Sequence, residues 1–315
     1  MKIDDINNIA IIGTGMIGAS LAALFTGNGY RTTMLAMSER GEKTGLVRYQ
    51  THYQDLAQKG LVTEAQAAIC RSYLTITRDI DAIRDADFIV ECLAENLELK
   101  HRIYQRVEEH CDKFRAIVST TSAISPKDLC SKIKAKERLA VAHPYNPPHL
   151  VPCVEIVPSE HTSPETIQII ETFLRSVGRE PVTMQKEAPG FIANRLQHAL
   201  FREAVYMVEA GIASPEAIDQ ALRTSFAPRY TSIGIFEHFD YAGLDMIISI
   251  EDYLFPTLCN ARETQGLIRE RCERGELGFK TGRGVYDWSK KDADDFRRRS
   301  SEPYFNCFNW SLPTE

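Results

Sequence analysis

A histidine and a glutamate stand at a spacing that could support acid–base chemistry. His143 follows the apolar run RLAVA (138–142), so it lies at the carboxyl end of a predicted strand, where open α/β sheets bind their ligands. Glu155 lies twelve residues further on, inside the apolar run CVEIV (153–157), where a carboxylate is normally excluded unless it is paired. A carboxylate beside a histidine can fix the tautomer and stabilise the imidazolium. The two residues therefore predict either a general base with its orienting acid or a plain buried ion pair.

Three glycines near the amino terminus indicate a dinucleotide site. Gly13, Gly15 and Gly18 have the spacing G-x-G-x-x-G, directly after the apolar run IAII (9–12) and before an Ala/Leu-rich helical pattern. In that context the glycines allow a tight turn, the approach of a pyrophosphate and close helix–strand packing. The alternatives are a glycine-rich turn that binds nothing and a Rossmann-type methyltransferase.

The end of the second predicted strand departs from the usual dinucleotide pattern. The acidic residue expected there, which would bind the ribose 2′-hydroxyl, is replaced by Ala36. Ser38 and Arg40 follow and could receive the 2′-phosphate of NADP, whereas Glu39 could turn inward and take the place of the missing carboxylate. The residues alone leave both NAD and NADP open and predict relaxed discrimination between them.

The elements that must position these residues form an alternating pattern. Continuous apolar runs separated by helical patterns predict a doubly wound, mostly parallel sheet, which is an N-terminal Rossmann domain. The predicted strands are 9–12, 31–36, 86–93, 115–120, 138–143, 153–157 and 181–184, and the predicted helices are 19–25, 98–110, 126–133 and 164–177. The stretch of about 42–72 is helical and long for a crossover, so we interpret it as an inserted arm.

From residue 189 onward the periodicity is almost entirely helical. We therefore expect two domains: a dinucleotide-binding domain over 1–187, and an all-α substrate and dimerisation domain over 188–315.

Composition narrows the class of protein. The chain has 315 residues and a formal net charge of −6, so no basic surface for nucleic acid or an anionic membrane is expected. The run from Ile9 to Phe25 is shorter than the roughly 20 residues that a membrane span needs. The polar start MKIDDINN predicts no secretory signal, and eight cysteines without metal-ligand spacing predict reduced thiols in the cytoplasm and no metal site.

Several longer motifs resemble one family over nearly the whole chain. The motifs are IGTGMIG (12–18), ECLAENLELK (91–100), STTS (119–122), HPYNPPHLVPCVEIVP (143–158), PGFIANRL (189–196), FEHFDYAGLD (236–245) and GFKTGRGVYDW (278–288). Together they resemble the 3-hydroxyacyl-CoA dehydrogenase superfamily. This superfamily has 3-hydroxybutyryl-CoA dehydrogenase, L-gulonate 3-dehydrogenase, lambda-crystallin and carnitine dehydrogenase branches. The resemblance implies an NAD-dependent oxidoreductase that forms a homodimer through its helical domain.

The resemblance also implies roles for individual residues, which are catalysis for His143 and Glu155, binding of the substrate oxygen for Ser122 and Asn194, and proximity to the nicotinamide for Glu95 and Lys100. The residues themselves agree in part. Ser122 follows a predicted strand, although a Ser/Thr turn before Pro126 would look the same. Asn194 lies on the first helix of the second domain, where an exposed asparagine is the commoner case.

The substrate remains divided between two branches. HPYNPP (143–148) and RYTSIG (229–234) resemble the branch that acts on free hydroxy acids such as L-gulonate or carnitine, and Arg229 could bind a free carboxylate, cap a helix or join a salt bridge. FEHFDYAGLD and GFKTGRGVYDW resemble the acyl-CoA branch, and the basic residues of the arm could meet CoA phosphates. We favour a short 3-hydroxyacyl-CoA, such as 3-hydroxybutyryl-CoA in fatty acid metabolism. A non-catalytic, crystallin-like protein is the other class, against which the intact His143, Glu155, Ser122 and Asn194 set argues.

Overall fold

The computed structural model describes residues 6–314 and contains two compact units. The first unit runs to Ile192 and includes the segment from Ser301 onward, and the second is Ala193–Ser300. The first five residues, which begin the MKIDDINN start, lie outside the described residues. Within those described, no helix is both long and apolar enough to cross a bilayer.

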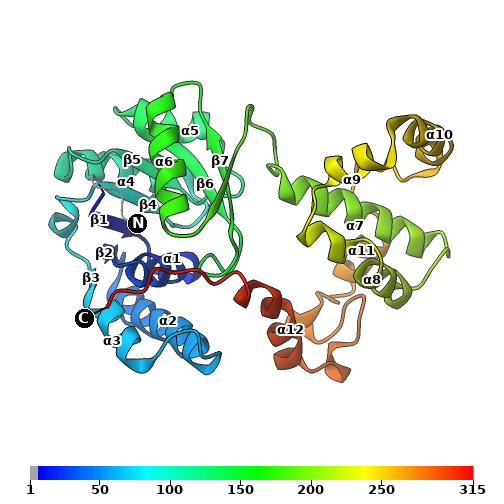
Figure 1. Ribbon diagram of the computed structural model, residues 1–315, viewed down its shortest axis with the longest axis horizontal. Coiled ribbons are helices and arrows are strands. Elements are labelled where there is room, and N and C mark those ends of the chain that lie inside the picture. Colours follow the sequence, from blue (N-terminus) through cyan, green and yellow to red (C-terminus); the bar gives the residue numbers. More distant parts are fainter. Residues whose placement is uncertain (1–5, 315) are drawn as a thin grey trace. The chain divides into compact units, whose positions relative to one another are not determined.

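The first unit contains an eight-stranded sheet with helices on both faces (Figure 1). The strand order is β3-β2-β1-β4-β5-β6-β7-β8. The strands are β1 (Asn8–Ile12), β2 (Arg31–Leu35), β3 (Leu74–Thr77), β4 (Phe88–Glu91), β5 (Ala116–Ser119), β6 (Leu139–Pro144), β7 (Cys153–Pro158) and β8 (Glu180–Thr183). Neighbouring strands from β3 through to β6 are parallel, which confirms the predicted Rossmann sheet. The edge strand β3 was not predicted, because LTIT is short and half-buried.

The helices of this unit cover both faces of the sheet, because the strands carry apolar side chains on both faces. They are α1 (Met16–Gly27), α2 (Glu39–Gln58), α3 (Glu64–Ser72), α4 (Leu97–His110), α5 (Pro126–Cys130) and α6 (Pro164–Ser176), with short 3₁₀ turns at Ile80–Ile83 and Lys136–Arg138. In β1, Ile9 and Ile11 join one buried cluster while Ala10 and Ile12 join the other, since successive side chains point to opposite faces. Both faces of the sheet are therefore buried, as in other parallel sheets.

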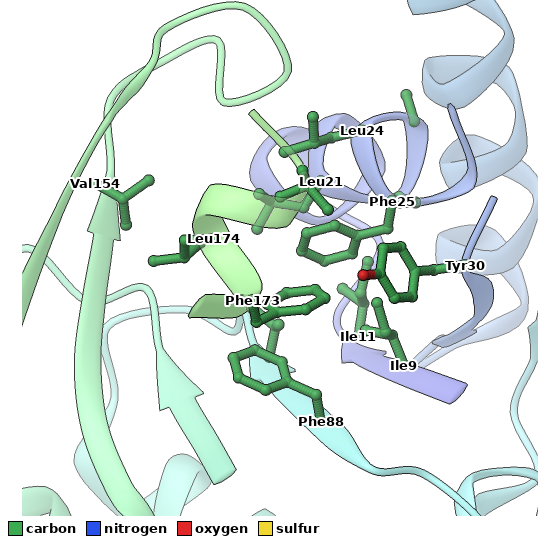
Figure 2. Packing of buried hydrophobic residues seen from close by; sticks show 14 of the residues in the cluster. Ile9, Ile11, Leu21, Leu24, Phe25, Tyr30, Phe88, Val154, Phe173 and Leu174 are labelled. Atoms are coloured by element: carbon green, nitrogen blue, oxygen red, sulfur yellow. The ribbon is translucent and has the colours of Figure 1, made fainter. Parts of the chain in front are cut away.

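An aromatic group fills the core beneath α1 and α6. The ring of Phe173 lies 5.2 Å from Phe25, 5.4 Å from Tyr30 and 4.3 Å from Phe88, centroid to centroid (Figure 2). These tilted and edge-on contacts are the favourable geometries for aromatic pairs. They tie α6, which follows the strand of Glu155, to the helix that begins at the glycine turn.

The predicted arm at 42–72 is two helices, of which α2 packs on α1. Tyr49 and Tyr53 are buried there, and their hydroxyls lie 2.9 and 3.1 Å from Oγ1 of Thr26. Burial and hydrogen bonding to α1 make α2 part of the Rossmann unit.

The last residues of the chain return to the first unit, which corrects the predicted helical domain of 188–315. In Figure 1 the segment after α12 (Ala293–Phe305) runs along α1. Trp310 is buried against Gly27, and the backbone N–H of Ser311 donates to Oδ1 of Asn28 at 2.9 Å. A sequence pattern cannot show this return, because the segment is short and its apolar residues are irregularly spaced.

The second unit is helical, as predicted. It contains α7 (Ala193–Glu209), α8 (Pro215–Thr224), α9 (Ile235–Ala242), α10 (Leu244–Leu254) and α11 (Gly266–Glu273), with 3₁₀ turns at Ala227–Thr231, Phe255–Thr257, Phe279–Thr281 and Trp288–Lys290.

Candidate active site

The predicted site residues of the first unit follow neighbouring strands at one edge of the sheet. Ile12 pairs with Glu91 across β1 and β4, Glu91 with Ser119 across β4 and β5, and Ser119 with Val141 across β5 and β6. The glycine turn follows β1, Ser122 follows β5, and His143 lies near the end of β6. These residues therefore lie at the carboxyl ends of neighbouring strands. The strand order reverses between β1 and β4, which is where doubly wound sheets bind ligands.

His143 and Glu155 face each other across an antiparallel strand pair. They are register partners on β6 and β7, and Nδ1 of His143 lies 2.9 Å from Oε2 of Glu155. Antiparallel pairing puts opposite side chains on the same face, so the twelve-residue spacing becomes a direct contact. An ionised carboxylate only accepts hydrogen bonds, so Nδ1 is the donor in this contact, and Nε2 is the ring nitrogen that Glu155 does not engage. His143 is 8% exposed and Glu155 1%.

Two further groups hold the Glu155 carboxylate. The backbone N–H of Ile192 donates to Oε1 at 2.8 Å, and the hydroxyl of Tyr145 donates to Oε2 at 3.3 Å. Phe191 precedes Ile192 with a φ of +52°, and its buried ring lies 5.3 Å from the His143 ring. The segment that leads into the second unit is therefore attached to the histidine–glutamate pair. Left-handed geometry at a bulky residue is unusual and needs such surroundings to persist.

Ser122 is exposed beside the carboxylate of Glu95. Oε1 of Glu95 accepts from the backbone N–H of Ser122 at 2.9 Å and lies 3.4 Å from the Ser122 hydroxyl. The Thr121 hydroxyl donates to both oxygens of Glu95, at 2.9 and 2.8 Å. Glu95 thus ties the loop after β4 to the loop after β5.

Lys100, which the resemblance places near the nicotinamide, is held by a buried carboxylate. It is 0% exposed, and Nζ lies 2.7 and 2.9 Å from the two carboxylate oxygens of Glu91, which is itself buried. Oε2 of Glu91 also accepts from the hydroxyls of Tyr104 at 2.8 Å and Ser119 at 2.7 Å. Burial and the adjacent Glu91 charge raise the pKa of Tyr104 well above its ordinary value. Lys100 is therefore part of a buried polar network that fastens α4 to β4 and β5.

Packing within the protein explains why two positions of the glycine turn are glycine, but it does not explain Gly15. A Cβ on Gly13 would lie 2.7 Å from the carbonyl oxygen of Cys92, and one on Gly18 would lie 2.2 Å from that of Gly13. Within the described residues, a Cβ on Gly15 would meet no atom within 4 Å. Gly15 is also the N-cap of α1, where no side chain caps the helix and no acidic residue occupies the first turn. The helix start is therefore exposed and suited to an anion.

The N-terminus of α2 lies against this turn. Oγ1 of Thr14 donates to the carbonyl of Gly41 at 2.8 Å, and Ser38 caps α2 by accepting from the N–H of Gly41 at 3.0 Å. Ala36 is buried at the end of β2, while Ser38 and Arg40 are exposed. The Ser38 hydroxyl thus has a structural role as a cap, and Arg40 faces solvent.

Two predicted substrate residues belong to the second unit. Asn194 is the second residue of α7 and is half-buried, and Arg229 is exposed in the turn at Ala227–Thr231.

Comparison with known proteins places this arrangement in a family. The NAD-binding domain model of 3-hydroxyacyl-CoA dehydrogenases matches residues 8–188, and the C-terminal domain model matches 190–288. The chain belongs to the 3-hydroxyacyl-CoA dehydrogenase family. It is therefore an NAD-dependent oxidoreductase, which confirms the predicted class and the predicted use of NAD.

Individual members differ in what they are named for. The chain is 30% identical to 5-formyl-3-hydroxy-2-methylpyridine 4-carboxylate 5-dehydrogenase of Mesorhizobium japonicum, over 91% of this chain and 93% of that enzyme. It is 35% identical to an L-carnitine dehydrogenase of the same organism, over 76% of this chain and 65% of that enzyme.

Solved structures show the same division. The pyridine carboxylate dehydrogenase, described as an NAD⁺-dependent dismutase, superposes with a TM-score of 0.84 at 28% identity, covering 96% of this chain and 97% of that one. (S)-3-hydroxybutyryl-CoA dehydrogenase of Ralstonia eutropha superposes with a TM-score of 0.75 at 28% identity, covering 90% and 100%.

The residues present fit NAD. The open space at Gly15 and the uncapped start of α1 would hold the pyrophosphate, which is what a dinucleotide-binding turn requires. Cys92 lies beside this turn, and burial raises the pKa of its thiol to about 12, so it stays protonated near neutral pH. In the described part of the chain, no group of three or more His, Cys, Asp or Glu side chains could hold a metal ion.

Sequence reasoning missed two features of the site. Tyr145 lies within the quoted HPYNPP motif, yet only the structure shows its hydroxyl on Glu155. Glu91 carries the same signal that singled out Glu155, an acidic residue at an apolar strand, in FIVE (88–91). Applying that rule to both strands would have found the network around Lys100.

Proposed function

We propose that this NAD-dependent enzyme oxidises the hydroxyl group of a small, free hydroxy acid, with His143 as the general base and Glu155 as its orienting acid. The observation that carries the proposal is the 2.9 Å contact of Nδ1 with the buried carboxylate at the carboxyl edge of the sheet. It leaves Nε2 of His143 as the proton acceptor.

The reaction follows from this tautomer. Nε2 of His143 takes the proton of the substrate hydroxyl, and the O–H bonding pair becomes the second bond of a carbonyl. The hydrogen on the carbon that bears this hydroxyl leaves with its electron pair. NAD, when bound, supplies the acceptor for that hydride. Glu155 stabilises the imidazolium that forms, and in the reverse direction the imidazolium returns the proton. Ser122 and Asn194 bind the reacting oxygen in this proposal, and Arg229 binds the free carboxylate.

The preference for a free acid has two supports. Two of the similar relatives are named for a pyridine carboxylate and for carnitine. The basic residues expected to meet CoA phosphates already have partners: Lys43 with Glu39 at 2.7 Å, Arg48 with the carbonyl of Thr14 at 3.2 Å, Lys59 with Glu302 at 2.7 Å and Arg71 with the carbonyl of Leu74 at 2.7 Å. This ordering reverses the sequence-based preference for an acyl-CoA.

A short 3-hydroxyacyl-CoA is the second candidate, and with it a role in fatty acid metabolism. It is favoured by the superposition on 3-hydroxybutyryl-CoA dehydrogenase and by the family models. Lys59→Glu discriminates between the two, because charge reversal raises KM for an acyl-CoA and leaves KM for a small acid unchanged.

The direct experiment measures NAD reduction with a panel of free hydroxy acids and with 3-hydroxyacyl-CoAs. His143→Ala is expected to lower kcat by about 10²–10⁴-fold, the usual contribution of a general base, while NAD binding stays normal. Ser122→Ala and Asn194→Ala are expected to weaken transition-state stabilisation more than NAD binding. Unchanged turnover in His143→Ala would end the assignment of the base, and activity on acyl-CoAs alone would replace the first substrate class by the second.

The proposed assembly is a homodimer formed through the second unit. Only Val205 and Ile247 are buried among its large apolar side chains in the described residues, whereas Phe236 is 89% and Tyr241 94% exposed. A groove of about 680 Å³ between α7 and α8 is lined by apolar side chains that include Phe201. Exposed apolar surface on this scale marks an interface. Light scattering of the wild type should give twice the chain mass, and Phe201→Glu should shift it toward the monomer.

Two further parts of the proposal concern setting and selectivity. Eight free cysteines favour a reducing compartment, so we place the enzyme in the cytoplasm. Ala36 removes the carboxylate that would repel a 2′-phosphate, so NADP is expected to be accepted as well as NAD. Ala36→Asp should then increase the preference for NAD, and Arg40→Ala should lower efficiency with NADP.

A further inference from the structure

Tyr145 occupies a specific place beside the histidine–glutamate pair. It is the first residue after β6, and its ring stands edge-on to the His143 ring, with centroids 5.2 Å apart and planes at 70°. Its hydroxyl donates to Oε2 of Glu155 at 3.3 Å, which is the same oxygen that Nδ1 of His143 contacts at 2.9 Å. The phenol and the imidazole therefore share one carboxylate oxygen.

The other oxygen is held from a different part of the chain. Oε1 of Glu155 accepts the backbone N–H of Ile192 at 2.8 Å. With donors on both oxygens, rotation of the carboxylate about its last torsion breaks at least one hydrogen bond. The carboxylate is buried, and the interaction is charge-assisted, so each such bond restricts it more than it would in water.

We propose that Tyr145 is a positioning residue for the reaction. Its hydroxyl holds the Glu155 carboxylate in the orientation in which Oε2 faces Nδ1 of His143, so that the ring stays oriented with Nε2 directed away from the carboxylate. This inference rests on the proposed function of the pair. A phenylalanine would fill the same half-buried space and keep the ring contact with His143, so the hydroxyl is the part of Tyr145 that the inference concerns.

The strength of an ordinary hydrogen bond sets the expected size of the effect on kcat. Hydrogen bonds of catalytic groups are often long without substrate and tighten in the reacting complex. A net hydrogen bond of ordinary strength corresponds to about a 2- to 10-fold change in an equilibrium or rate. Tyr145→Phe should therefore lower kcat by about 2- to 10-fold and leave KM for NAD unchanged, because the hydroxyl bonds to Glu155 on β7 and the glycine turn follows β1.

Tyr30→Phe is the matched control. The Tyr30 hydroxyl lies 2.9 Å from Oγ of Ser176, and Tyr30 immediately precedes β2, at the amino end of the strand and not at the carboxyl edge, so this variant also loses a phenolic hydrogen bond. It should keep wild-type kcat. An equal loss of kcat in Tyr30→Phe and Tyr145→Phe would show a general effect on the fold and would overturn the inference.

A double-mutant cycle with Glu155→Gln tests whether Tyr145 acts through the carboxylate. If it does, adding Tyr145→Phe to Glu155→Gln should change kcat by less than about 2-fold, because the orientation is already lost. Fully additive losses would mean that the hydroxyl acts elsewhere, and the inference would be wrong. Wild-type kcat in Tyr145→Phe together with a large loss in His143→Ala would overturn this inference alone, whereas normal turnover in His143→Ala would overturn the proposed function.

Discussion

The glycine turn offers a prediction that separates binding from folding. Gly15 has φ −69° and ψ −171°, which any residue can adopt, and a Cβ there would lie more than 4 Å from every atom of residues 6–314 outside the turn itself. Gly18 has a similar neighbourhood in sequence, but its Cβ would lie 2.2 Å from the carbonyl oxygen of Gly13. Gly15→Ala should therefore fold normally and bind NAD poorly, whereas Gly18→Ala should fold poorly.

The structure allows both magnitudes to be worked out. At Gly15 the added methyl enters space where the pyrophosphate would approach, and overpacking of about 1–3 kcal/mol corresponds to roughly 5- to 150-fold weaker binding. Its effect on folding is small, because the loss of unfolded-state entropy, worth about 0.4–1 kcal/mol, offsets the weaker N-cap. At Gly18 a rigid backbone oxygen blocks the methyl, so a loss of at least about 1–3 kcal/mol in the free energy of unfolding is expected.

Titration calorimetry with NAD and thermal unfolding without it measure the two quantities independently. Each 1 kcal/mol lost should lower the unfolding midpoint of a domain this size by about 2–4 °C in Gly18→Ala. Gly15→Ala should unfold within a few degrees of wild type. Wild-type NAD affinity in Gly15→Ala would show that the space at this glycine is not the cofactor cradle, and equal destabilisation of both variants would show that the packing argument is wrong.

Three further predictions concern stability. Burial lowers the pKa of His52 to about 4 and that of His149 to about 2. Below the ordinary pKa of about 6.5 the unfolded chain therefore binds more protons than the folded one, and the free energy of unfolding should fall by up to ~1.4 kcal/mol per pH unit for each histidine as the pH drops toward 4. Unfolding midpoints measured from pH 7 to pH 5 should fall less steeply in His52→Gln. Trp310→Ala should cost about 3–5 kcal/mol, and Gly27→Ala, whose Cβ would lie 2.2 Å from the Trp310 ring, should destabilise the wild type but not the Trp310→Ala variant in urea titrations. Lys100→Met leaves a buried carboxylate unpaired, so it should cost about 3–5 kcal/mol in the same titration while the folded fraction keeps its NAD affinity, and weakened NAD binding in that fraction would contradict a purely structural role for Lys100.

Most of the sheet could be predicted from the sequence because its strands are buried on both faces. Runs such as IAII and LAVA have no polar alternation to confuse with a helix, and each ends at residues suited to chemistry. His143 and Glu155 could be identified as a pair from the cost of burying a carboxylate, without knowledge of the antiparallel register that brings them together.

Contacts between distant segments could not be predicted. The return of the C-terminal segment depends on Trp310 fitting the side of α1 where Gly27 has no side chain, and neither residue signals the other in the sequence. The placement of Lys100 likewise depended on which of two nearby carboxylates would receive it. The buried Glu91 does so at 2.7 Å, and the partly exposed Glu95 lies 3.8 Å from Nζ, because a charge in low dielectric gains more from its partner than one in water.

The two buried carboxylates of the sheet show why one is structural and the other is suited to catalysis. Glu91 accepts from a lysine, two hydroxyls and the backbone N–H of Leu93, and these donors come from α4, β5 and the loop after β4, so they fasten the carboxylate in place. Glu155 accepts from Nδ1 of an imidazole, the side chain that most often serves as general acid and base in enzymes, and the second ring nitrogen is not engaged by Glu155. The same burial that makes Glu91 a fixed anchor makes the charge of Glu155 strongly felt by His143. The identity of the partner, and not the presence of an acid in an apolar strand, therefore decides which carboxylate can take part in proton transfer.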